Sequence, residues 1–327
     1  MISENYAENL LLTDLPNPLN NQISCNIKNL IVIAGPTGIG KTKLAVELSE
    51  FLGAEIFSAD SRQIYREMSI GTAKPSPEEL EMIRHHFINH KSIHETYNVG
   101  MYESEILDSL NKYFQVSKNA LLVGGTGLYI RAVLEGLDQF PDIPKEVTEH
   151  YDTLLKEKGV GVLSQILIEK DPAYAQVVDH KNPQRLIRAL SVIHHTDRRF
   201  SEFLSFEKKP REFKVITLVL HEERDTLYEK INVRVDQMIQ AGLIEECRML
   251  YEFKHLPALQ TVGYQEIMNY FDGIWDKDTA IEKVKQHSRN YAKRQITWFK
   301  KYIPSHWILP TDIKGAKDLI RLSNDAD

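Results

Sequence analysis

Eight residues near the start of the chain have the types and spacing of a loop that binds phosphate. They match the pattern G-x-x-x-x-G-K-[ST] and are Gly35, Pro36, Thr37, Gly38, Ile39, Gly40, Lys41 and Thr42. The apolar run LIVIA precedes them and the amphipathic run KTKLAVELSEFL follows, so the loop joins a predicted strand to a predicted helix. Backbone N–H groups of such a loop converge on phosphate oxygens at the positive end of the helix. Lys41 adds a positive charge and the Thr42 hydroxyl can bind Mg²⁺, so the pattern predicts a bound di- or triphosphate.

One carboxylate, Asp60, is suitably placed to work beside that loop. It follows the predicted strand in the segment EIFSADS, and an acid at the carboxyl end of a parallel strand faces the crevice that holds the phosphate loop. Asp60 could bind a metal, position an acceptor or act as a base, or it could cap a following helix that begins DSRQIY. A small-molecule kinase would also need a metal-binding acid at the end of an apolar strand. The strand at 120–123 ends in Gly-Gly-Thr-Gly instead, which makes a kinase the less favoured alternative.

Short apolar runs that alternate with helical patterns predict the sheet that must position these residues. The runs are residues 30–34, 55–57, 120–123 and 215–220. Buried strands that alternate with helices indicate an α/β fold, here a parallel sheet like that of the P-loop NTPases with helices on both faces. A long helix is predicted from about residue 279 to 302.

The strand signals vanish between residues 141 and 206. Periods of 3.6 residues, broken at Pro172 and Pro183, predict several short helices there and therefore an inserted all-helical domain. We expect a polar N-terminal extension at 1–29, an α/β core made of 30–140 and 207–327, and the insertion at 141–206. The extension carries no sequence signal for a function.

Composition limits the possible classes of protein. The 327 residues are 42% hydrophobic and 26% charged, without a run of 18 apolar residues, so we expect no membrane span. The two cysteines, Cys25 and Cys247, have neither a pairing pattern nor zinc spacing, and the N-terminus has acids where a secretory signal needs bases. These features favour a reducing cytoplasm. Four histidines, His85, His86, His90 and His94, lack an acidic or cysteine partner in the sequence pattern, and we interpret them as structural.

The net charge of −6 argues against a nucleic-acid partner only if the charge is evenly spread. The segment KVKQHSRNYAKRQITWFKK, residues 283–301, contains no acid and could bind RNA. For an isolated run of this kind, a solvated helix face is the favoured explanation. Within it, Trp298 and Phe299 could line an RNA groove or pack in the core.

Several motifs together resemble the tRNA dimethylallyltransferase family, also called isopentenyl-tRNA transferases. They are GPTGIGKT, SADSRQIYREMSIGTAKP, LLVGGTGLYIRAVLEGL, DHKNPQRLIRAL, TVGYQEI and RNYAKRQITWFKK. They occur in the family's order, and no zinc finger follows them, which indicates the bacterial type. Asp197 stands where the pattern usually has a glycine, so we expect a different turn in the insertion.

The resemblance implies an activity with two substrates. Dimethylallyl pyrophosphate is the donor, and the acceptor is N6 of the adenosine 3′-adjacent to the anticodon in tRNAs that read codons beginning with U. It implies that Asp60 is the general base, that Lys41, Thr42 and Arg234 act on the pyrophosphate, and that Mg²⁺ is the cofactor. Without the resemblance, Arg234 would be interpreted as a solvated helix residue. We expect a monomer.

The resemblance also implies which residues contact tRNA. They are Asp60, Ser61, Arg62, Gln63, Thr126, Gln184, Arg185, Leu186, Ile187, Arg188, Gln260, Thr261, Val262, Gly263, Tyr264 and Gln265. Arg185 and Arg188 are three residues apart, on one face of a helix, where they could reach backbone phosphates. The alternatives are a prenyltransferase that acts on free adenine nucleotides and a tRNA-binding protein that has lost catalysis.

Overall fold

Among the residues that the structure describes, six parallel strands form one central sheet. The computed structural model describes residues 27–205 and 207–325, so most of the predicted extension at 1–29 lies outside the described residues. The strand order is β3-β2-β4-β1-β5-β6, and every neighbouring pair is parallel. In sequence order the strands are β1 (Asn29–Ala34), β2 (Ile56–Ser58), β3 (His85–His86), β4 (Asn119–Gly124), β5 (Lys214–Leu220) and β6 (His306–Ile308). The predicted α/β class is confirmed.

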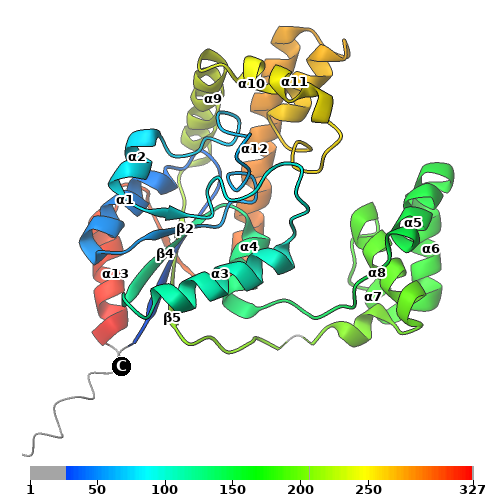
Figure 1. Ribbon diagram of the computed structural model, residues 1–327, viewed down its shortest axis with the longest axis horizontal. Helices are drawn as coiled ribbons and strands as arrows, with labels where there is room; N and C mark the ends of the chain where they lie inside the picture. The colour runs from blue at the N-terminus through cyan, green and yellow to red at the C-terminus, as the bar shows by residue number, and fades with distance from the viewer. Residues whose placement is uncertain (1–26, 206, 326–327) are drawn as a thin grey trace, which may run out of the picture.

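Helices cover both faces of the sheet because its strands are apolar on both sides. In β1, Leu30 and Val32 pack into one core while Ile31 and Ile33 pack into another. The helices of the first layer include α3 (Val99–Tyr113) and α4 (Gly127–Glu135), and those of the second include α1 (Lys41–Leu52) and α13 (Ile313–Asp325). Figure 1 shows the two layers on opposite sides of the strands. A continuous apolar pattern is what a doubly covered parallel strand requires.

Four helices beyond β5 build the part of the molecule that overhangs the carboxyl ends of the strands (Figure 1). They are α9 (Arg224–Gln240), α10 (Leu243–Met249), α11 (Tyr264–Phe271) and α12 (Lys277–Tyr302). The long helix predicted from residue 279 begins two residues earlier, because the Asp276 side chain caps it by accepting from the Thr279 amide at 2.8 Å. Helix α12 packs against α9, α11 and α4, so it links the sheet to the overhanging helices.

The segment between α4 and β5 is mainly helical and has a core of its own. Its helices are α5 (Lys145–Lys158), α6 (Val160–Lys170), α7 (Pro172–Ala175) and α8 (Pro183–Thr196). Pro172 and Pro183 occupy first-turn positions, so these prolines begin helices as well as interrupting the pattern. Leu167 and Leu190 are among the residues that close the separate core. Figure 1 shows these helices standing away from the sheet, joined to it by two connecting segments.

Short helices and turns complete the described chain. They include α2 (Pro77–Met82), which begins with a capping box at Ser76, and the 3-10 turns η1 (Phe200–Phe203) and η2 (Tyr251–Phe253). None of the helices within 27–205 and 207–325 is long and apolar enough to cross a membrane.

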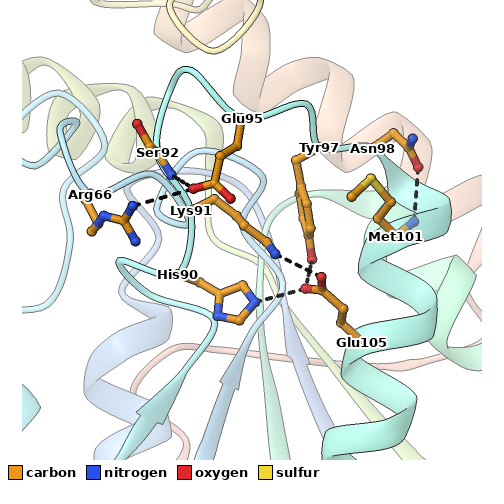
Figure 2. Close-up of polar contacts among 9 residues, drawn as sticks. All are labelled: Arg66, His90, Lys91, Ser92, Glu95, Tyr97, Asn98, Met101 and Glu105. Atoms are coloured by element: carbon orange, nitrogen blue, oxygen red, sulfur yellow. Dashed lines mark hydrogen bonds and ion pairs between the residues drawn. The ribbon is translucent and has the colours of Figure 1, made fainter.

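The segment after β3 is fastened to α3 by a partly exposed network of polar contacts that is drawn in Figure 2. The Glu105 carboxylate lies 2.9 Å from each of His90 Nε2, Lys91 Nζ and the Tyr97 hydroxyl. Among the other histidines of this region, His86 Nε2 lies 2.6 Å from Glu55 Oε2. These contacts give the histidines structural partners, and they hold the segment that supports residues 62–74.

A candidate site at the carboxyl ends of the strands

The phosphate loop connects β1, a central strand, to the first turn of α1. Its glycines take conformations that side chains disfavour: Gly38 has φ +79° and Gly40 has φ +95°. A Cβ at Gly38 would also lie 2.8 Å from a side-chain carbon of Ile231. Within the described part of the chain, no hydrogen bond uses the amides of residues 38–40. The loop thus presents free N–H groups at a helix N-terminus, as an anion site requires.

Lys41 folds back over this loop. Its ammonium donates to the carbonyls of Gly35 and Pro36 at 3.0 and 2.9 Å. Burial, followed by the nearby charge of Arg234, lowers the pKa of Lys41 to about 8, while Asp60 opposes the shift. The ammonium is therefore poorly compensated in the free protein, and an anion in the loop would stabilise it.

Asp60 lies two residues beyond β2 and divides its carboxylate between two tasks. Oδ1 accepts from the amides of Arg62 and Gln63, at 2.8 and 3.2 Å. The predicted capping contact therefore exists, but it closes a turn and not a helix. The other oxygen, Oδ2, makes no hydrogen bond to the described residues, and Asp60 lines a cleft at the carboxyl ends of the strands, the main cleft. This oxygen is thus available to a ligand.

The main cleft has a volume of about 370 Å³ and collects residues from distant parts of the chain. The cleft is lined by Thr37 of the phosphate loop, by Asp60 and by Arg234. Burial lowers the pKa of Arg234, and Asp60 opposes this. One wall is apolar and comes from α9 and α12, with Ile231, Val235, Met238 and Val284. A cleft with anion-binding groups at one end and an apolar wall fits a ligand that has both an anionic group and an apolar part.

Of residues 61–63 and Thr126, only Ser61 and Arg62 line the cleft. The Thr126 hydroxyl accepts from the Ser61 amide at 3.0 Å and donates to the Ser61 hydroxyl at 3.2 Å. Arg62 donates to the carbonyls of Pro257 and Ala258 at 3.0 and 3.1 Å. The Gln63 side chain donates to the carbonyls of Thr72 and Ala73 at 3.2 and 3.0 Å. Arg62 and Gln63 therefore brace the loops around the mouth.

The predicted contact segment 260–265 forms the opposite side of the cleft. Five of its residues line the cavity, namely Gln260, Thr261, Val262, Gly263 and Gln265. Tyr264 does not, because its ring is completely buried and its hydroxyl donates to Glu246 at 2.6 Å. The same carboxylate accepts from the amides of Ser69, Ile70 and Gly71 at 2.8 to 3.0 Å. Tyr264 thus fixes the segment 69–71 at the rim of the cleft.

The contact residues predicted in α8 are not brought to the cleft. Gln184, Arg185 and Arg188 are exposed on the insertion, while Leu186 and Ile187 are buried in its core. The Arg188 guanidinium lies 5.3 Å from the centre of the Phe140 ring, and partial burial lowers its pKa. Arg185 and Arg188 therefore form a basic surface that is separate from the cleft.

Thr42 lies outside the main cleft, in a neighbouring cavity of about 30 Å³. Ser58 and Gln63 also line this cavity, and the Ser58 hydroxyl is buried without a hydrogen-bond partner among the described residues. Neutral oxygens beside a phosphate loop fit Mg²⁺, which binds few protein groups and keeps water and phosphate ligands. In the described ranges no three acidic, histidine or cysteine side chains gather as a complete metal site.

Several cleft residues carry no signal that identifies them individually in the sequence. Gly71 and Thr72 come from the motif after Asp60, whereas Ser288, Tyr291 and Arg294 lie one turn apart on α12. Their spacing of three residues, inside the acid-free segment 283–301, is the signal that a helical projection could have used. Burial and then Asp60 raise the pKa of Tyr291 to about 12. Phe299 is completely buried and Trp298 packs against the core, so the core interpretation of this pair is correct.

Comparison with known proteins gives the same family from sequence and from structure. The model of the family described as IPP transferase matches residues 63–302. A tRNA dimethylallyltransferase of Christiangramia forsetii is 47% identical over 278 residues, which are 85% of this chain and 92% of the relative. A tRNA dimethylallyltransferase 1 of Bacteroides fragilis is 42% identical over 300 residues, with 90% and 98% covered.

Solved structures agree. A tRNA isopentenylpyrophosphate transferase of Bacillus halodurans aligns with a TM-score of 0.66 and 34% identity, covering 91% of this chain and 95% of that one. A eukaryotic dimethylallyltransferase acting on tRNA aligns with a TM-score of 0.76 and 26% identity, covering 91% and 79%. The motifs therefore identified the family correctly: the chain belongs to the IPP transferase family.

Proposed function

We propose that this protein is a tRNA dimethylallyltransferase. It transfers the dimethylallyl group of dimethylallyl pyrophosphate to N6 of the adenosine 3′-adjacent to the anticodon, in tRNAs that read codons beginning with U. The observation that carries the proposal is the cleft in which the phosphate loop, Asp60 and an apolar wall meet. The apolar wall fits the hydrocarbon part of a prenyl donor, which phosphoryl transfer by a kinase or a nucleotide hydrolase does not require. Family membership supports the same activity.

The donor end of the cleft matches a prenyl pyrophosphate. The pyrophosphate would accept from the free amides of the loop and pair with Lys41 and Arg234, and the five-carbon chain would pack on Ile231, Val235 and Met238. When the allylic C–O bond breaks, its electron pair goes to pyrophosphate. Lys41 and Arg234 stabilise the charge that develops there.

The acceptor end matches an adenine amine. Its N6 forms the new C–N bond at the allylic carbon and loses a proton, and the free oxygen of Asp60 is the base that accepts this proton. Tyr291 lines the cleft together with Asp60, and Thr126 is hydrogen-bonded to the neighbouring Ser61, so both would help to orient the base. An adenosine in a stacked anticodon loop must leave the stack to enter such a cleft.

The anticodon stem-loop would contact both the cleft mouth and the insertion. Arg185 and Arg188 would pair with phosphates, while residues 260–263 and Gln265 would contact the loop nucleotides. RNA and donor meet in the cytoplasm, where we place the reaction. A monomer is sufficient for it, because each of these groups comes from one chain.

Mg²⁺ is the cofactor that we propose for the pyrophosphate. Thr42, with Ser58 next to it in the small cavity, would hold the hydrated ion at the loop. The ion supplies neutralisation of the leaving group's charge. Lys41 and the loop amides bind the same oxygens from the protein side.

The direct test is transfer of radiolabel from dimethylallyl pyrophosphate to tRNA that lacks the modification, with AMP as a parallel acceptor and Mg²⁺ present. We expect label in tRNA, and its loss when the target adenosine is replaced. Label in AMP alone would assign the protein to the free-nucleotide class. Turnover of ATP without label in either acceptor would assign it to the kinases. Binding of tRNA without any transfer would indicate a protein that has lost catalysis.

A further inference from the structure

Gln295 of α12 joins two loops that are remote in sequence. Its side-chain oxygen accepts from the Thr37 amide at 2.9 Å, and its side-chain nitrogen donates to the Gly125 carbonyl at 2.8 Å. The residue is only 7% exposed, so both ends of the amide are satisfied within the protein. Thr37 belongs to the loop after β1, and Gly125 belongs to the loop after β4. Gln295 therefore fixes the separation of the two loops at the carboxyl edge of the sheet.

The Gln295 side chain is packed so closely against Gly125 that no side-chain atom would fit between them. A Cβ on Gly125 would lie 2.5 Å from the Gln295 nitrogen and 3.6 Å from Lys41 Nζ. The bridge also needs one acceptor and one donor at the same time, which an amide supplies and a carboxylate does not. Both the size and the chemistry of glutamine are thus matched to the gap.

The position of the bridge connects it to the chemistry. Thr37 is the phosphate-loop residue that reaches the main cleft. Because Gln295 occupies its amide, the free amides that remain for an anion are those after Thr37. On the same helix, Tyr291 and Arg294 line the acceptor side of the cleft. One rigid helix thus holds the donor loop and part of the acceptor wall in a fixed relation.

We propose that Gln295 is a positioning residue that aligns the phosphate loop, and with it the allylic carbon, against the acceptor held beside α12. This inference rests on the proposed function and adds a group that touches neither substrate. Misplacement of reacting groups by about 1 Å can cost on the order of 100-fold in rate. Loss of the bridge should therefore slow the transfer step much more than it weakens binding of tRNA.

The first variant is Gln295→Met, which keeps the length of the side chain and removes both hydrogen bonds. The matched control is Gln115→Met, because Gln115 is exposed just beyond α3, outside both the cleft and segment 283–301. In single-turnover transfer with saturating donor, we expect the Gln295 variant to be slower by roughly 10- to 100-fold. Its affinity for tRNA should stay within about twofold of the wild type, and the control should behave as the wild type. A transfer rate within about twofold of the wild type would overturn the proposal.

The second variant is Gln295→Glu, and its pH profile separates positioning from loss of stability. A protonated carboxyl can accept from Thr37 and donate to Gly125, whereas a carboxylate cannot make the second bond. The rate of this variant relative to the wild type should rise as pH falls, while the relative rate of Gln295→Met stays flat. A flat ratio for the glutamate variant would refute the two-bond bridge, whatever the melting temperatures of the variants.

Failure of the proposed function would be recognised separately. If the wild type transfers no label to tRNA, binding of pyrophosphate alone becomes the readout for Gln295. A loop that loses its support binds more weakly, because it must be ordered on binding. We then expect an affinity roughly tenfold lower in Gln295→Met, and an unchanged affinity would contradict the positioning role.

Discussion

At the scale of single residues, the two oxygens of Asp60 have different roles. Oδ1 closes the turn over the amides of Arg62 and Gln63, and Oδ2, which has no hydrogen bond to the described residues, is the oxygen that we propose as the base. Asparagine can keep the first role, because its side-chain oxygen also accepts from the two amides, but it cannot accept the proton of the adenine amine. We therefore predict that Asp60→Asn retains the fold and tRNA affinity and loses roughly two to three orders of magnitude in kcat.

Single-turnover transfer and tRNA binding, measured on the same preparation, test this prediction. Asp60→Ala is the matched comparison: it removes both roles, so it should also lower the melting temperature. Near-normal turnover in the asparagine variant would remove Asp60 as the base and leave it with the turn alone.

Lys41 should make donor binding depend on pH. Burial and Arg234 lower its pKa to about 8, so in the free protein the ammonium predominates at pH 7 and the neutral amine at pH 9. The donor's negative charge favours the ammonium and raises the pKa in the complex. We therefore expect donor affinity to be level below pH 8 and to fall above it, by at most about tenfold per pH unit.

Titration calorimetry with dimethylallyl pyrophosphate, without divalent metal, measures this dependence. At pH 8.5, binding should take up a fraction of a proton, seen as different heats in two buffers of unlike ionisation enthalpy. Lys41→Met is the control and should bind weakly with no fall of affinity above pH 8. An equal fall in both proteins would show that another group titrates.

At the scale of elements, Asp197 is the residue at which the turn was expected to differ. The observed turn has the geometry that favours glycine: Asp197 ends α8 in the left-handed region with φ +54° and ψ +22°, and its amide donates to Ile193. Aspartate tolerates this region better than most side chains but remains strained there. We predict that Asp197→Gly stabilises the insertion by about 0.5 to 1 kcal/mol, the relief of strain less the entropy of a more flexible unfolded chain.

Denaturant unfolding, followed by hydrogen exchange in α8, tests this prediction because it reports on the insertion separately from the sheet. Activity should not change, since Asp197 lies away from the cleft. A loss of stability would mean that the aspartate side chain makes a contact that outweighs the strain.

The elements that the sequence predicts well are those with a long enough pattern. The four central strands and α12 were placed within two residues, because buried strands and a 26-residue helix leave clear periodicities. The edge strands β3 and β6 were missed. They have two and three residues, and the first is a pair of histidines, so neither has a period or an apolar run.

The sequence predicts some residues of the site and not others for a related reason. A contiguous motif, such as the phosphate loop, can be recognised directly, and Asp60 could be placed from the end of its strand. The burial of Tyr264 and the bridge made by Gln295 depend on contacts between segments 18 and 258 residues apart, which no local pattern encodes. Family resemblance marked the segment around Tyr264 as contacting tRNA, but it could not tell which of its side chains point inward.

At the scale of the whole molecule, charge and shape together explain how an acidic protein can bind RNA. The net charge is −6, but basic side chains gather in two places, around α12 at the cleft and on α8 of the insertion. The insertion stands away from the sheet with a core of its own (Figure 1). A stem-loop that reaches into the cleft can thus be held at a second point, which adds affinity without adding contacts at the reacting base.

Arg185 tests this two-point model. It is exposed on α8, three residues before Arg188, and lies outside the cleft. Replacement by alanine should weaken tRNA binding and reduce the slope of log K against log salt by about 0.7 to 0.9, the value for one lost phosphate contact. The single-turnover rate at saturating tRNA should be unchanged, because the reacting groups are untouched. Arg321→Ala, on α13 across the sheet, is the control and should leave the slope as it is. An unaltered slope in Arg185→Ala would remove α8 from the interface, and the cleft mouth alone would then have to account for recognition of the RNA.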